Sequence, residues 1–219
     1  MTANEILSKV DHTLLKAFAT REDIDKICED ALKYHTASVC IPPSYVKYAH
    51  EKWPELNVCT VIGFPLGYNT TAVKVFEAAE AIREGASEID MVINIGDMKN
   101  GDYDKVKEEV AALREATRGY ILKVIIETCY LTEEEKKIMC RIVTETGADF
   151  IKTSTGFGTA GATKEDIELF KANVGENVKI KAAGGMKTLE DVKMFAEMGC
   201  DRLGTSSAMR LLKEAGEIE

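Results

Sequence analysis

Short apolar runs alternate with amphipathic helical segments along the whole of this 219-residue sequence. An N-terminal helical segment is followed by a first strand-like run at 11–15, and seven more runs come after it. These runs are 37–41, 58–63, 88–94, 120–127, 149–155, 178–183 and 202–206. Strands that alternate with helices form parallel sheets with the helices packed outside, so this pattern predicts an α/β protein.

Four of the helical segments begin with a threonine that is followed three residues later by an acidic residue. The pairs are Thr20 with Asp23, Thr132 with Glu135, Thr163 with Asp166, and Thr188 with Asp191. Such a pair caps the free amide groups of the first helical turn. Apolar residues then recur at helical spacing, which gives each helix one face that can pack on a sheet.

Together these patterns predict a single (β/α)8 TIM barrel with a short N-terminal helix, in which residues 1–219 form one domain. No linker rich in Pro, Gly or Ser interrupts the alternation. The alternative fold is a doubly wound open sheet. A G-x-G-x-x-G motif after the first strand would support that alternative, and the sequence has none there.

The charge and the cysteines exclude several classes of protein. Lys and Arg total 28 against 37 Asp and Glu, whereas a nucleic-acid-binding protein needs a basic face. No run approaches the roughly 20 apolar residues of a membrane span, and residues 1–5 do not resemble a secretion signal. We therefore expect a cytoplasmic protein that binds neither nucleic acid nor membranes. The cysteines and histidines lack metal-ligand spacing, so we expect free thiols and no metal.

Two lysines, Lys152 and Lys181, lie at the ends of apolar strands, where an unpaired ammonium group is costly to bury. Two ammonium groups side by side repel each other, so one can release its proton and become a nucleophilic amine that attacks a carbonyl. Asp90, within an earlier strand, can reach the same barrel mouth and relay protons. A lone lysine at a strand end is more often solvated or salt-bridged, and the pairing of two such lysines favours catalysis.

Glycine-rich segments follow the last two expected strands. TIM barrels commonly bind phosphate at these loops through backbone amides. Gly184 and Gly185 follow one strand, and Gly204 with Ser206 and Ser207 ends the other, which predicts a phosphorylated small-molecule ligand. Ordinary turns are the alternative. The other candidates at strand ends are Asp11, His12, Cys40, the 63–67 turn and Asn94. A histidine such as His12 is more often structural, and Cys40 is more typical of core packing than of a nucleophile.

Five motifs, in this order, resemble the deoxyribose-phosphate aldolase family. They are Asp11-His12-Thr13-Leu14-Leu15-Lys16, Val61-Ile62-Gly63-Phe64-Pro65-Leu66-Gly67, Glu88-Ile89-Asp90-Met91-Val92-Ile93-Asn94, Lys152-Thr153-Ser154-Thr155-Gly156-Phe157 and Lys181-Ala182-Ala183-Gly184-Gly185. The resemblance extends from Asp11 to Ser207, which is nearly the whole chain.

The resemblance implies a class I aldolase on a TIM barrel that needs neither metal nor cofactor. Its reaction would be the reversible cleavage of 2-deoxy-D-ribose 5-phosphate to D-glyceraldehyde 3-phosphate and acetaldehyde, in deoxynucleoside catabolism. Lys152 would form the Schiff base, Lys181 would favour the neutral amine of Lys152, and Asp90 would move protons through a bound water. The implied substrate- and phosphate-binding residues are Asp11, Cys40, Gly156, Gly184, Gly185, Gly204, Ser206 and Ser207.

The sequence departs from the family pattern at two places. Some members end in a tyrosine that assists proton transfer, whereas this sequence ends at Gly216-Glu217-Ile218-Glu219. Some members also place a lysine where this chain has Phe157. Two other functions stay open: another lysine-dependent lyase on a barrel, and a sugar-phosphate-binding protein without turnover. The sequence does not define the oligomeric state, for which a homodimer is the working expectation.

Overall fold

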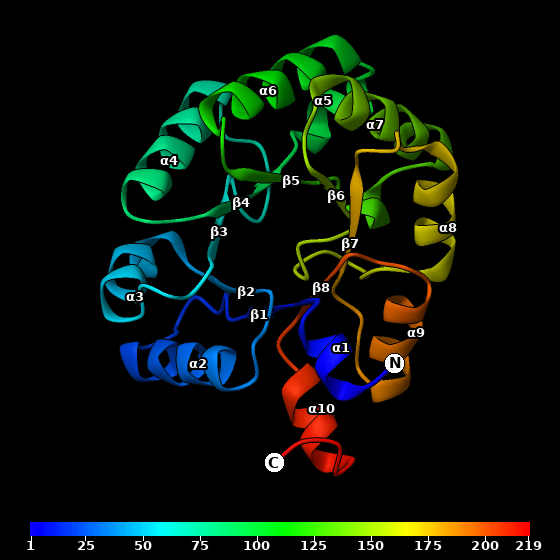
Figure 1. The fold of residues 1–219 in the computed structure, drawn as a ribbon. Helices are drawn as coiled ribbons and strands as arrows, with labels where there is room; N and C mark the ends of the chain where they lie inside the picture. The colour runs from blue at the N-terminus through cyan, green and yellow to red at the C-terminus, as the bar shows by residue number, and fades with distance from the viewer.

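The computed structural model describes residues 1–219 and contains a closed barrel of eight parallel strands that pair in sequential order (Figure 1). The strands are β1 (Val10–Thr13), β2 (Ser38–Ile41), β3 (Val58–Ile62), β4 (Glu88–Val92), β5 (Ile121–Ile125), β6 (Phe150–Lys152), β7 (Lys179–Ala183) and β8 (Arg202–Thr205). β8 pairs with β1 and closes the sheet. The TIM-barrel prediction is confirmed.

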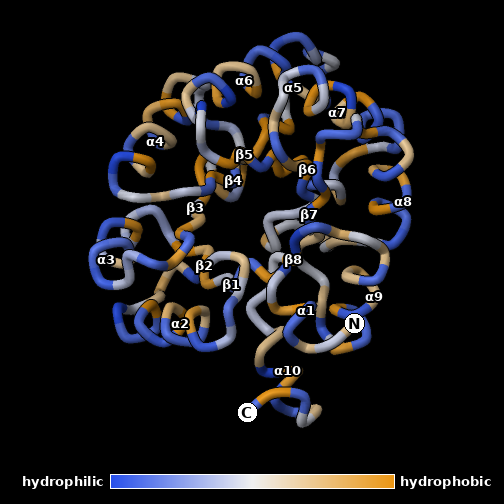
Figure 2. Tube along the Cα trace, viewed as in Figure 1, coloured by the Kyte–Doolittle hydropathy of each residue, from blue (hydrophilic) through white to orange (hydrophobic).

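Helices surround the barrel and cover its outer face (Figure 1). They are α1 (Ala3–Leu7), α2 (Arg21–Lys33), α3 (Val46–Lys52), α4 (Thr71–Arg83), α5 (Ile95–Asn100), α6 (Tyr103–Ala116), α7 (Glu133–Thr146), α8 (Lys164–Asn173), α9 (Leu189–Glu197) and α10 (Ala208–Glu214), with the 3-10 turns η1 (Pro43–Tyr45) and η2 (Thr128–Tyr130). Hydrophobic residues lie along strands β2 to β5, while the outer turns of the helices are hydrophilic (Figure 2). No helix combines the length and the apolar composition that a membrane crossing requires.

All four predicted threonine caps form. Each threonine side chain accepts a hydrogen bond from the backbone N–H three residues on, and in three of the four helices the acid returns a bond to the cap. Asp166 at the start of α8 is the exception, because its buried carboxylate accepts from Thr128 Oγ1 at 2.8 Å and from Lys136 Nζ at 2.6 Å. The helix starts are therefore set locally, while Asp166 also holds the loop after β5.

The alternation of side chains along each strand separates two environments. Outward-facing residues such as Ile89, Leu122 and Ile151 are fully buried in the apolar layer between strands and helices. Their neighbours Asp90 and Lys123 face inward, and both are equally buried. Successive strand residues point to opposite faces, so the same runs build an apolar shell and a charged barrel interior.

The β6 strand ends at Lys152, three residues earlier than expected. The Thr155 N–H donates to the Glu127 carboxylate at 3.1 Å instead of to a neighbouring strand. Thr153 still donates its N–H to Lys181 O of β7 at 3.1 Å, so the chain leaves the sheet only after Thr153 and turns into the barrel mouth at Thr155. The chain just after Lys152 is thus a loop that Glu127 holds.

Candidate active site

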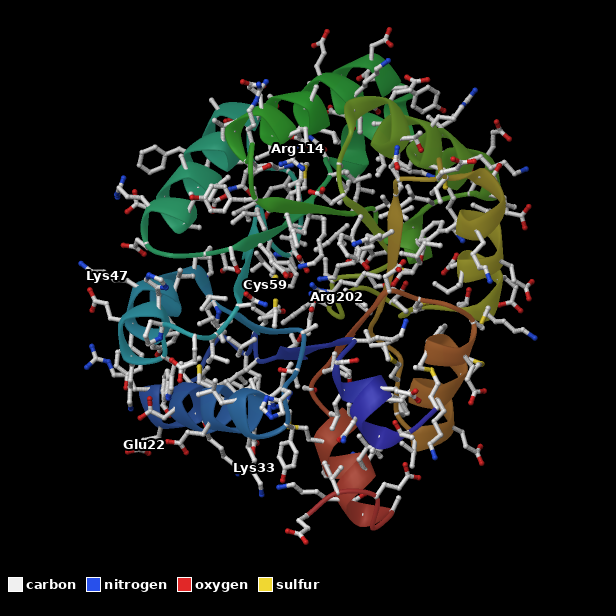
Figure 3. All side chains as sticks on the ribbon, viewed as in Figure 1. Glu22, Lys33, Lys47, Cys59, Arg114 and Arg202 are labelled. Carbon is white, nitrogen blue, oxygen red and sulfur yellow. The ribbon has the colours of Figure 1, made fainter.

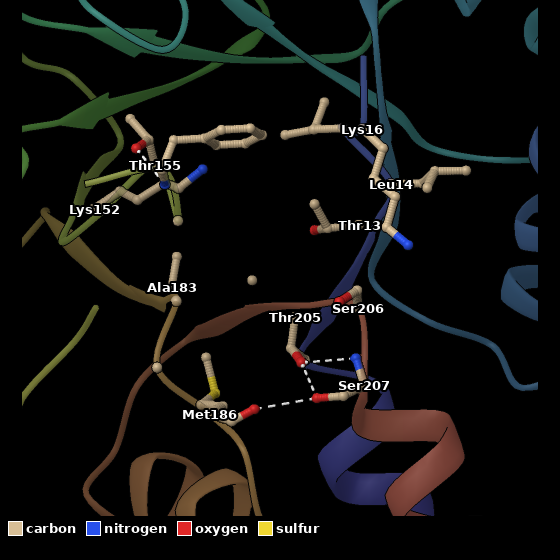
Figure 4. Close-up of a pocket in the computed structure, with 16 residues that line it drawn as sticks. Thr13, Leu14, Lys16, Lys152, Thr155, Ala183, Met186, Thr205, Ser206 and Ser207 are labelled. Atoms are coloured by element: carbon tan, nitrogen blue, oxygen red, sulfur yellow. Dashed lines mark hydrogen bonds between the residues drawn. The ribbon is translucent and has the colours of Figure 1, made fainter. Parts of the chain in front are cut away.

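A cavity of about 270 Å³ opens at the carboxyl ends of the strands (Figure 4). It is lined by Thr13, Leu14, Leu15, Lys16, Lys152, Thr155, Gly156, Phe157, Ala183, Gly184, Gly185, Met186, Gly204, Thr205, Ser206 and Ser207. Lys152 and Thr155 lie on one wall, and Ser206 and Ser207 lie across from them. Seven of the residues predicted from sequence line this cavity: Lys152, Gly156, Gly184, Gly185, Gly204, Ser206 and Ser207.

Asp90 joins the two predicted lysines beneath the cavity. Its Oδ2 lies 2.7 Å from the Nζ of Lys152 and 2.7 Å from the Nζ of Lys181. Its Oδ1 accepts from Lys123 Nζ at 2.8 Å. Burial alone would raise the pKa of Asp90, but the three ammonium groups outweigh it and hold that pKa well below its ordinary value. Asp90 is therefore an anion that pairs with lysines from the three strands β5, β6 and β7.

A second layer of charges continues the network toward the opposite end of the barrel. Asp11 accepts from Lys181 Nζ and from Arg202 Nη1, each at 2.5 Å. Glu88 lies 2.6 Å from Lys123 Nζ and also pairs with the Arg202 guanidinium. Arg202 lies near the barrel axis in Figure 3. Each carboxylate touches at least two cations, so the interior charges form one continuous network.

Cations outnumber carboxylates in this network. It contains the cations Lys123, Lys152, Lys181 and Arg202 and the carboxylates Asp11, Glu88 and Asp90. Burial alone would lower the pKa of Lys181, but Asp11 and Asp90 outweigh it and raise that pKa well above its ordinary value. Asp11 and Asp90 act in the same way on the pKa of Lys123. Both residues thus stay charged, whereas Lys152 has Asp90 as its single carboxylate partner and lines the cavity.

The glycine-rich segments form the far end of the cavity. Gly184 and Gly185 have φ angles of +71° and +77°, which L side chains rarely adopt. Gly161 packs against them so closely that a Cβ there would lie 2.3 Å from the Gly184 carbonyl carbon. This packing leaves backbone rather than side chains facing the cavity, which is the arrangement that binds an anion. Lys16 and Lys152 are the charged residues of the lining.

Comparison with known proteins agrees with this geometry. The model of the DeoC/LacD family of aldolases matches residues 6–207. This chain belongs to the DeoC/LacD aldolase family. It is 62% identical over 214 residues to the deoxyribose-phosphate aldolase of Clostridium botulinum strain Alaska E43, with 97% of each chain covered. It is 60% identical to that of Clostridioides difficile strain 630, with 95% of each chain covered.

Solved structures of the aldolase family have the same fold. A putative deoxyribose-phosphate aldolase from Coccidioides immitis superposes with a TM-score of 0.94 at 37% identity, covering 99% of this chain and 87% of that one. A deoxyribose phosphate aldolase from Aeropyrum pernix, described as a unique tetramer, gives 0.89 at 29% identity, covering 98% and 92%.

Four predicted residues of this DeoC/LacD aldolase lie one layer below the cavity: Asp11, Cys40, Asp90 and Lys181. Asp11 and Lys181 each precede a lining residue by two positions, which places them about 7 Å deeper along their strands. The predicted contact of Asp11 with a substrate is indirect in this geometry, because its carboxylate binds Lys181 and Arg202. Cys40 is paired in register with Cys59, whose Sγ lies 3.2 Å from Asp90 Oδ1.

The site residues predicted for this aldolase did not include Lys123, Glu88, Arg202, Lys16 or Glu127. Lys123 carries the same signal that singled out Lys152, a lysine inside an apolar run. Glu88 and Arg202 begin their strands, where a charged residue is ordinary. Only the register, in which Arg202 pairs with Lys181, brings Arg202 into the network.

Proposed function

We propose that this chain is a deoxyribose-phosphate aldolase that acts through a Schiff base on Lys152. It would reversibly cleave 2-deoxy-D-ribose 5-phosphate to D-glyceraldehyde 3-phosphate and acetaldehyde. The observation that carries this proposal is the position of Lys152, whose amine lies at a cavity wall and shares Asp90 with the ammonium group of Lys181. Membership of the aldolase family and the glycine-rich far end of the cavity support the substrate.

Lys152 has the fewest carboxylate partners among the cations of the interior network. Four cations face three carboxylates, so the network loses its excess charge when one cation releases a proton. Arg202 cannot do so, and Lys123 and Lys181 are each held by at least two carboxylates. In its unprotonated form, Lys152 attacks the aldehyde carbon C1 and forms an imine with loss of water.

The protonated imine accepts the electron pair of the C2–C3 bond as that bond breaks. The C3 hydroxyl gives up its proton and becomes the carbonyl of glyceraldehyde 3-phosphate, while Asp90 takes the proton through a water molecule. The enamine that remains gains a proton at C2, and water hydrolyses the resulting imine to release acetaldehyde. Retention of Asp90, Lys152 and Lys181 in one network argues against a pure binding protein, because phosphate binding requires none of them.

Borohydride trapping tests the proposal directly. Incubation with acetaldehyde and reduction should leave a two-carbon adduct on Lys152, located by peptide mass spectrometry. An adduct on Lys181 would exchange the roles of the two lysines. Folded protein that gains no adduct would overturn the aldolase function.

Lys16 gives a second test, directed at the phosphate end of the cavity. We expect Lys16→Gln to raise KM for 2-deoxyribose 5-phosphate about tenfold, because Lys16 is the one cation of the lining not used for the imine. Activity on unphosphorylated 2-deoxyribose should not change. Lys47→Gln is the matched control, since Lys47 lies on the outer side of α3 (Figure 3). Equal losses on both sugars would show that Lys16 does not contact the phosphate.

Two further expectations stay predictions. A cytoplasmic location follows from the sequence analysis and from the small phosphorylated substrate proposed here. A homodimer is the expected assembly, and gel filtration with light scattering measures it.

A further inference from the structure

Glu127 is a buried acid in a strained backbone conformation directly behind the cavity. It follows β5 with φ of 51° and ψ of 67°, a left-handed conformation that is uncommon for a residue other than glycine. The residue is 2% exposed, and its carboxylate forms no ion pair. A charge buried in this way needs hydrogen-bond donors, and one residue supplies both of them.

That residue is Thr155, which lines the cavity (Figure 4). Glu127 Oε1 accepts from the Thr155 N–H at 3.1 Å, and Glu127 Oε2 accepts a short hydrogen bond from the Thr155 hydroxyl. The Phe157 N–H donates to Thr155 Oγ1 at 3.0 Å. The single hydroxyl proton of Thr155 is thus directed at Glu127, and one oxygen lone pair is directed at Phe157. Thr155 can offer a ligand only its remaining lone pair.

The loop after β6 is shaped around this carboxylate. A Cβ at Gly158 would lie 2.8 Å from Cys129 Sγ and 3.1 Å from Glu127 Cδ, so residue 158 approaches as only glycine can. Burial raises the pKa of Glu127, while its two bonds to Thr155 oppose that shift by favouring the anion. The loop therefore closes over a carboxyl group that both Thr155 donors reach, and this leaves the Thr155 hydroxyl with one orientation.

We infer that Glu127 is a positioning residue that sets the specificity of the reaction, because it makes Thr155 an acceptor for the C4 hydroxyl of the substrate. The inference rests on the proposed function. Lys152 binds C1, and the Asp90 side of the site receives the C3 proton. The C4 hydroxyl then lies between Lys152 and the glycine-rich end of the cavity, where Thr155 stands. A hydroxyl can donate a hydrogen bond to Thr155 Oγ1. An ether oxygen at the same place has no proton to donate and faces the lone pair of Thr155 Oγ1.

The variant Glu127→Gln reverses the direction of the hydrogen bond between residue 127 and Thr155 Oγ1, with little change of side-chain volume. The oxygen of the introduced amide can still accept from the Thr155 N–H, but the amide nitrogen donates to Thr155 Oγ1 and frees the hydroxyl proton to point into the cavity. In the synthetic direction, the α-hydroxyl of an acceptor aldehyde becomes the C4 hydroxyl. We therefore compare 2-hydroxyethanal with 2-methoxyethanal as acceptors for acetaldehyde. The ratio of their kcat/KM values should fall about tenfold in Glu127→Gln.

Asp166→Asn is the matched control. Asp166 is also buried and also accepts from a threonine hydroxyl, that of Thr128 next to Glu127, but its carboxylate forms no hydrogen bond or ion pair with a residue of the cavity lining. Its substitution should leave the acceptor ratio within about twofold of wild type. Equal falls of the ratio in the two variants, or an equal loss on both acceptors in Glu127→Gln, would reduce Glu127 to a structural role and overturn the inference.

Two further measurements keep the result decisive. Thr155→Ser should retain the wild-type ratio and Thr155→Val should lose it, which tests the acceptor even if Glu127→Gln does not fold. Trapping of the acetaldehyde imine separates the two proposals. Wild-type protein without an adduct on Lys152 would defeat the proposed function, whereas normal trapping with an unchanged ratio in Glu127→Gln and Thr155→Val would defeat this inference alone.

Discussion

Replacement of Lys152 by methionine is expected to lower kcat/KM for 2-deoxyribose 5-phosphate by at least about 10⁴-fold. Methionine keeps the volume and the apolar stem of the lysine but has no amine to attack C1. The remaining network, with Asp90 still held by Lys123 and Lys181, can bind the sugar but cannot form the electron sink. Cleavage assays at high protein concentration measure the loss of kcat/KM. Borohydride trapping with acetaldehyde measures the loss of imine formation.

Lys179→Met is the matched control for this prediction. Lys179 and Lys181 are two residues apart on β7, but Lys179 is exposed at the start of the strand, away from the cavity. Its substitution should leave activity within about twofold of wild type. If Lys152→Met kept more than a hundredth of the wild-type rate, or still formed the acetaldehyde adduct, another amine would have to carry the imine.

The barrel could be predicted because its local signals agree with its global structure. Each threonine cap defines a helix start, and each apolar run is long enough to be a strand and too short to be a helix. Lys152 and Lys181 were identifiable for the same reason, since a charge inside an apolar run conflicts with its surroundings. Lys123 carried that signal as well.

The rest of the network depends on register and on loop conformation, which no local pattern encodes. Arg202 enters the interior because its Cα pairs with that of Lys181, and Asp11 lies below the cavity because Thr13 occupies the lining position. Glu127 has an unremarkable place after a strand in the sequence. Its function depends on a left-handed backbone angle that turns the carboxylate toward Thr155.

Asp90→Asn is expected to cost about 3–5 kcal/mol of the free energy of unfolding at pH 7, as well as most of the activity. The substitution leaves three buried ammonium groups without their shared carboxylate. Urea unfolding followed by circular dichroism measures the loss. Asp97→Asn is the control, because the Asp97–Lys105 pair lies near the surface and should contribute less than about 1 kcal/mol.

The difference in the free energy of unfolding between wild type and Asp90→Asn depends on pH. That dependence tests whether the charge of Asp90, rather than its shape, stabilises the barrel. The pKa of Asp90 is well below its ordinary value in the folded protein, against about 3.9 in the unfolded chain. Above about pH 5 both states are ionised, and the ion pairs stabilise the fold in full. As the pH falls further, the unfolded chain takes up the proton first, so this stabilisation decreases until the folded protein is protonated too. The stability gap between wild type and Asp90→Asn should therefore be constant near neutrality and narrow in acid, and a gap that widened in acid would contradict the ionised network.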